Sequence, residues 1–139
     1  MNRADFQRLA GLRVEEAKIL LDQGYYSGAY YLAGYAVECA LKACIARQTK
    51  RHDFPPAPDV VRNMYVHDLA RLLKQAQLEA AHKSQRDANP QFRDNWDVVK
   101  DWSERSRYDY DISERRARDL YAAVTDRRNG VLSWLKKYW

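Results

Sequence analysis

The sequence predicts an all-α protein, and three observations lead to that prediction. Its 139 residues suffice for one hydrophobic core and are too few for two ordinary domains. It contains only 5 Gly and 4 Pro, whereas sandwiches and barrels need frequent turns. Apolar residues also recur every three to four positions over long stretches, which is the spacing of helices packed on a core. We therefore expect residues 1–139 to form a single helical domain.

The first predicted helix runs from Arg3 to Asp22. Its apolar side chains follow one face at the helical period, and they include Phe6, Ala10, Val14, Ala17 and Leu21. Gly24 is expected to end this helix. Tyr25 and Tyr26 would then form a link, with Ser27 as the N-cap of the next helix.

The second predicted helix, Gly28 to Arg47, is apolar on nearly every face, so its neighbours must cover most of it. Its only charged residues before the end are Glu38 and Lys42. Cys39 and Cys44 are five residues apart, which fits neither a zinc knuckle nor a redox Cys-x-x-Cys motif. We expect both cysteines to be small buried apolar residues.

The prolines between Gln48 and Pro58 predict the main loop, because they cannot sustain a helix. A third helix is expected from His67 or Asp68 to Ala80, fading into the polar stretch 82–89. Pro90 suits the first turn of a shorter helix that carries Phe92, Trp96 and Val99.

The last predicted helix begins near Ile112, at a capping-box pattern from Asp111 to Glu114, and continues to Leu135. Asn129-Gly130 is ordinarily a turn signal. Because the apolar phase holds across this pair, we expect one helix with a weakened middle rather than a hairpin.

The net charge of +5 is modest, since 24 basic residues are offset by 19 acidic ones. It favours an acidic partner such as RNA, but a mixed solvated surface explains most of it. No apolar run reaches the ~18 residues of a membrane span, and the first residues lack the apolar stretch of a signal peptide. We expect a cytoplasmic protein without a membrane partner. His52 and His82 have no carboxylate or cysteine at metal-ligand spacing, so no metal or other cofactor is expected.

Glu38 and Lys42 are one helical turn apart, in the favourable order for an ion pair. They are either a structural pair or two side chains that point into a polar pocket or a subunit interface, because charges on an apolar helix are costly without partners. The sequence leaves both alternatives open.

The segment from Trp102 to Asp111 gathers cations, hydroxyls and aromatic rings between two predicted helices. Arg107 suits the binding of a phosphate, and Tyr108 suits stacking on a base. In the alternative interpretation, Arg107 pairs with a carboxylate while Tyr108 and Trp102 close the core.

Four stretches in this order resemble the HEPN family: Ala17–Tyr31, Tyr35–Ala43, His67–Leu73, and Arg107-Tyr108 before the last helix. The resemblance covers nearly the whole chain. It implies a four- to five-helix antiparallel bundle, commonly a homodimer with a groove shared between subunits. Family members occur alone or beside a nucleotidyltransferase. Many are metal-independent endoribonucleases with an Arg-x4–6-His signature at the start of the last long helix.

This sequence departs from that signature, because no histidine follows Arg107 or occurs anywhere after His82. We therefore expect a non-catalytic or degenerate module. It would bind nucleotide, RNA or a partner protein, such as a nucleotidyltransferase-like protein or an antitoxin. The expected groove is lined by Glu38, Lys42, Arg107 and Tyr108.

Two alternatives remain open. An Arg-x4-His string at Arg62 and His67, or an atypical centre at Arg107 and Tyr108, would serve an endoribonuclease toxin of a toxin–antitoxin or defence system. His67 would otherwise be a capping or packing residue. The second alternative is a purely structural dimerisation module.

Overall fold

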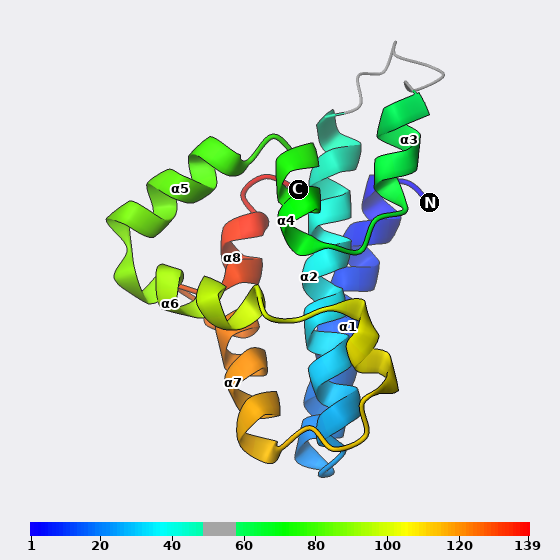
Figure 1. Cartoon of the computed structure of the whole chain (residues 1–139), viewed down its shortest axis with the longest axis vertical. Coiled ribbons are helices and arrows are strands. Elements are labelled where there is room, and N and C mark those ends of the chain that lie inside the picture. Colours follow the sequence, from blue (N-terminus) through cyan, green and yellow to red (C-terminus); the bar gives the residue numbers. More distant parts are fainter. Residues whose placement is uncertain (49–57) are drawn as a thin grey trace.

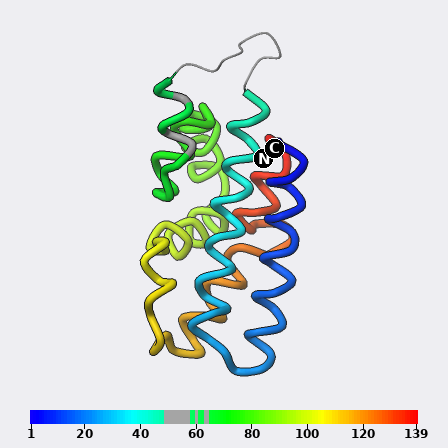
Figure 2. Tube along the Cα trace, turned by 90° about the vertical axis from the view of Figure 1, so that its right-hand side faces the viewer, coloured from blue at the N-terminus to red at the C-terminus, as the bar shows by residue number. Residues whose placement is uncertain are grey.

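The computed structural model describes residues 1–48 and 58–139. This part of the chain folds into eight α-helices and one 3₁₀ helix without a strand, which confirms the all-α prediction. The long α1 and α2 lie antiparallel, α7 and α8 run alongside them, and α4 and η1 pack on another side of α2, while α5 extends away from it (Figures 1 and 2). The elements are α1 (Arg3–Asp22), α2 (Tyr26–Gln48), α3 (Pro58–Met64), α4 (Leu69–Gln75), α5 (Glu79–Ala88), α6 (Pro90–Val99), η1 (Glu104–Tyr108), α7 (Glu114–Thr125) and α8 (Val131–Leu135).

The first helix has the predicted bounds, and its end is set by Gly24, whose φ is +82°. Glycine adopts this left-handed conformation without the steric cost of a Cβ. The start of α2 differs from the prediction, because the helix begins at Tyr26 and Ser27 is not its N-cap. The Ser27 hydroxyl instead accepts a hydrogen bond from the Ile112 backbone N–H at 3.1 Å, and so ties the segment before α7 to α2.

Helix α2 is the centre of the core, as its apolar composition predicts. It packs most extensively against α1 and α7, with η1, α4 and α8 completing its cover. Cys39 and Cys44 are both buried and free. Burial raises the thiol pKa of Cys39 to about 11 and that of Cys44 to about 12, so both remain protonated and unreactive at neutral pH.

The middle of the chain forms shorter and more numerous helices than its apolar pattern predicts. The expected third helix is two helices, because the chain turns at Gln77, which has a φ of 59°. The polar stretch expected to be irregular is α5, and α3 follows the proline loop where no helix was expected. Of that predicted loop, residues 49–57 lie outside the described residues.

The expected continuous last helix is also wrong, because α7 ends at Thr125 and α8 begins at Val131. The Asp126 carboxylate accepts hydrogen bonds from the backbone N–H groups of Arg128 and Asn129, which builds a turn between the helices. The chain nevertheless continues in the same general direction and forms no hairpin (Figures 1 and 2).

Candidate functional site

A buried carboxylate lies at the centre of the candidate site. The Glu38 side chain is 1% exposed within the apolar α2. Its Oε1 accepts a hydrogen bond from Lys42 Nζ at 2.8 Å and lies 2.8 Å from Nδ1 of His67. Oε2 is buried and has no hydrogen-bond partner among the described residues. Glu38 and Lys42 therefore form the ion pair that their spacing indicates, and His67 joins it from the segment between α3 and α4.

His67 connects two carboxylates from different elements. While Nδ1 faces Glu38, Nε2 lies 3.2 Å from Oε2 of Glu104, the first residue of η1. The neighbouring Asp68 is the N-cap of α4, and its side chain accepts a hydrogen bond from the Arg71 N–H at 2.8 Å. The cap fixes the start of α4 and thereby the position of His67. We name the group formed by Glu38, Lys42, His67 and Glu104 the His67 cluster.

Trp102 places η1 against α2. A Cβ added at Gly34 would lie 2.3 Å from three atoms of the indole ring, so the ring occupies the space that a larger residue would fill. Tyr31 stacks on Trp102 with ring centroids 6.2 Å apart, and on Tyr35 at 5.9 Å. The close approach at Gly34 therefore determines where η1 lies relative to the His67 cluster.

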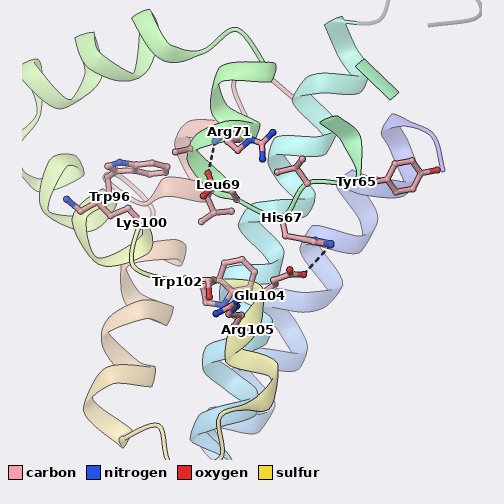
Figure 3. Close-up of a pocket in the computed structure, with 13 residues that line it drawn as sticks. Tyr65, His67, Leu69, Arg71, Trp96, Lys100, Trp102, Glu104 and Arg105 are labelled. Atoms are coloured by element: carbon pink, nitrogen blue, oxygen red, sulfur yellow. Dashed lines mark hydrogen bonds and ion pairs between the residues drawn. The ribbon is translucent and has the colours of Figure 1, made fainter. Parts of the chain in front are cut away.

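A pocket of about 440 Å³ opens beside this cluster, between the start of α4, the end of α6 and the start of η1. Trp96 and Trp102 line its interior. Arg71 of α4, Lys100 just after α6 and Arg105 of η1 lie around its edge (Figure 3). We name it the three-cation pocket.

The charges that line the three-cation pocket differ in their availability. Glu104 contacts His67, and the Asp68 side chain caps α4. Lys100 Nζ lies 3.1 Å from Asp97. The side chains of Arg71 and Arg105 form no ion pair with any residue that the structure describes. The pocket therefore offers unpaired guanidinium groups to an anion, while its carboxylates are already engaged.

Arg107 and Tyr108 lie at the far end of η1, and both are exposed. The Arg107 guanidinium lies 4.9 Å from the centroid of the Tyr108 ring, and a hydrogen bond with Tyr108 raises the pKa of Arg107. In the described part of the chain, no hydrogen bond or ion pair joins these two residues to Glu38 or Lys42. The four predicted groove residues thus form two separate pairs, which share only the contact of η1 with α2.

Arg62 lies within α3, whereas His67 lies in the segment that follows this helix. Arg62 is exposed, and its Nε donates a 3.4 Å hydrogen bond to the carbonyl of Pro58 in its own helix. His67 contacts a carboxylate at each ring nitrogen. While Glu104 keeps this position, neither ring nitrogen is free to act on a substrate.

Sequence reasoning did not single out Arg71 and Lys100, because each is an isolated cation in its own segment, and it noted Arg105 only as part of the cation-rich segment from Trp102 to Asp111. Surface arginines and lysines at helical spacing usually belong to a solvated face. Glu104 gave no separate signal either. The turn at Gln77, the close packing of Trp102 and the packing of α4 and η1 on α2 bring these elements together.

Two further observations concern metal ligands and membrane-spanning helices. In residues 1–48 and 58–139, no three side chains of His, Cys, Asp or Glu are grouped as they would be to hold a metal ion. No helix in these ranges has both the length and the apolar character needed to cross a membrane. Of the two histidines considered above as metal ligands, His52 lies outside the described residues, and His82 is buried among aromatic rings of α6 and α8.

The comparisons with known proteins agree with the fold. The model of the HEPN domain family matches residues 5–138, which is nearly the whole chain. No curated protein and no solved structure matches it. The helical bundle and the extent of the family match lead to one conclusion: the chain belongs to the HEPN domain family.

Proposed function

We propose that this HEPN domain is a non-catalytic module that binds the phosphate groups of RNA or a nucleotide in the three-cation pocket. The observation that carries the proposal is the convergence of Arg71, Lys100 and Arg105 on one pocket whose carboxylates are engaged elsewhere. Guanidinium groups bind phosphate through two parallel hydrogen bonds. An anion at this edge would therefore replace water around Arg71 and Arg105, which have no competing carboxylate among the described residues.

The size and surroundings of the pocket support a nucleotide-sized ligand. Its volume of about 440 Å³ lies within the range of small-molecule and cofactor sites. Tyr65 lines one end and is 79% exposed, so its ring is available to stack on a base. Arg107 and Tyr108 add a further cation for a phosphate and a second aromatic ring for a base further along η1, which favours a ligand longer than one nucleotide.

The geometry favours binding over cleavage. A general base must approach the proton it removes with a free nitrogen or oxygen. Both ring nitrogens of His67 face carboxylates, and Arg62 bonds within its own helix. The His67 cluster therefore acts as the support of a pocket wall in this proposal, and the signature histidine of the nuclease members has no counterpart after Arg107.

Calorimetric titration with ATP, GTP and a ten-nucleotide single-stranded RNA tests the proposal. We expect at least one of these ligands to bind, and we expect the double variant Arg71→Gln/Arg105→Gln to weaken that binding at least tenfold. The matched control is Arg8→Gln/Arg127→Gln, which removes the same charge from exposed sites outside the pocket. Equal weakening by both double variants, or no binding of any ligand, would refute the proposal.

We also propose that the module forms a homodimer through the face shared by α1 and α2. A groove of about 350 Å³ on this face is lined mainly by apolar and aromatic side chains, among them Phe6, Leu9 and Tyr35. Such grooves favour burial against a partner. Leu9→Glu should shift the mass measured by light scattering toward the monomer, whereas Leu12→Glu, on the same helix but outside the groove, should not. A monomeric wild-type protein would refute the dimer.

A further inference from the structure

The number of hydrogens at His67 determines how many of its contacts can be hydrogen bonds. Glu38 Oε1 lies 2.8 Å from Nδ1, and Glu104 Oε2 lies 3.2 Å from Nε2. An ionised carboxylate only accepts hydrogen bonds, and a neutral imidazole carries a single N–H. His67 therefore donates to both carboxylates only as imidazolium. A neutral ring turns a nitrogen lone pair toward one of them.

Losing the hydrogen bond from His67 costs more free energy at one of the two carboxylates than at the other. The Glu38 side chain is 1% exposed, whereas the Glu104 side chain is 34% exposed. A buried carboxylate that loses a partner finds no water to replace it, so the cost is high. Glu104 can turn to solvent instead. A neutral His67 therefore keeps its proton toward Glu38 and releases Glu104.

Release of Glu104 acts directly on the proposed binding site. Glu104 and Arg105 are adjacent in η1, and both line the three-cation pocket. The His67 contact is the one ion pair that joins η1 to another element within the described residues. Figure 3 shows this contact at the boundary between the segment before α4 and η1.

We infer that protonation of His67 fastens η1 against α2 and so closes one wall of the three-cation pocket, which makes ligand binding proton-linked. This regulation rests on the proposed function. The charged groups around His67 are Glu38 and Lys42 from α2, Glu104 and Arg105 from η1, and Asp68 with Arg71 at the start of α4. Lys42 donates to Glu38 and Asp68 caps α4, so the two glutamates are the acceptors that face the ring nitrogens of His67.

The first test uses the free protein, so it does not depend on any ligand. Hydrogen-exchange protection of the Ser106 and Asp109 amides reports on η1, since both donate backbone hydrogen bonds within or at the end of this helix. Protection, corrected for the intrinsic exchange rate, should fall about tenfold from pH 5.5 to pH 8, the range in which imidazoles titrate. His67→Gln, which cannot titrate, should abolish this pH dependence, and His52→Gln should leave it unchanged.

Glu104→Gln tests whether the protonation state of His67, rather than the contact with residue 104 as such, holds η1 in place. A glutamine side chain both donates and accepts, so a neutral His67 can satisfy Glu38 and residue 104 together. This variant should keep η1 protected at both pH values. Protection that is the same at both pH values in wild type, or a pH dependence that persists in His67→Gln, would overturn the inference.

The second test measures the affinity of the ten-nucleotide RNA, without a terminal phosphate, at the same two pH values. Wild type should bind about tenfold more weakly at pH 8, because the wall then loses the charge-assisted hydrogen bond from His67 to Glu104. His67→Gln and Glu104→Gln should each bind equally at the two pH values, because in neither variant does this contact depend on a proton of the imidazole. Binding that is equal at both pH values in wild type contradicts the link between η1 and the pocket. No binding at either pH, with the expected change in protection, refutes the proposed function alone.

Discussion

Acidification should destabilise this bundle through His82. The imidazole is 4% exposed and lies in α5 against the rings of Phe92, Trp96 and Trp134. Burial, and then the charge of Arg86, lower its pKa from 6.5 to about 4. The unfolded state therefore binds a proton before the folded state does. The stabilising effect is complete above pH 6.5 and is lost as the pH falls from there to about 4.

The size of this effect follows from the change in pKa. A change of one unit corresponds to about 1.4 kcal/mol, so the difference between 6.5 and about 4 amounts to about 3 kcal/mol of unfolding free energy. That is a large fraction of the roughly 5–15 kcal/mol that stabilises a typical domain.

Urea unfolding at pH 7 and pH 4.5, followed by tryptophan fluorescence, measures the effect. Carboxyl groups also titrate in this range. The informative quantity is therefore the loss of unfolding free energy between pH 7 and pH 4.5 in wild type minus the same loss in His82→Leu. This difference should be about 2–3 kcal/mol. Equal losses in the two proteins would show that His82 is not held neutral in the core, and would refute the reasoning.

The remaining predictions concern the helix packing and the buried ion pair. Gly34→Ala should cost about 1–3 kcal/mol of unfolding free energy, because its Cβ would lie 2.3 Å from the ring of Trp102. Gly11→Ala, whose Cβ meets nothing within 4 Å, should instead stabilise α1 by about 0.5–1 kcal/mol, and a loss there would contradict the space seen around it. Lys42→Met should cost about 2–3 kcal/mol in urea unfolding, because it removes a charged donor from a buried carboxylate. Lys18→Met breaks an exposed pair of the same spacing and should cost less than about 1 kcal/mol, so equal costs for the two lysines would refute the burial argument.

The parts of the fold that the sequence predicts are those with strong local signals. The bounds of α1 follow from its apolar period and from Gly24, and α6 follows from Asn89 and Pro90. The breaks near Gln77 and Asp126 were missed because the apolar phase continues across both. In each case a turn inside a periodic stretch is stabilised by side-chain and tertiary contacts that the period does not report.

The candidate site is predictable only where its partners are close in sequence. Glu38 and Lys42 are one turn apart, so their pairing follows from helix geometry alone. His67 and Glu104 come from segments that the chain brings together by folding, and Trp102 reaches α2 only because residue 34 is glycine. No local pattern contains that information.

The salt dependence of RNA binding tests the central claim, that unpaired cations of the three-cation pocket bind phosphates, most directly. Affinity of the ten-nucleotide RNA is measured from 50 to 300 mM salt for wild type, Arg71→Gln/Arg105→Gln and the control pair Arg8→Gln/Arg127→Gln. Each phosphate contact on a single strand contributes about 0.7 to the slope of log affinity against log salt. The pocket variant should therefore lower the slope by about 1.4, and the control should leave it unchanged. Equal slopes for all three proteins would contradict the account.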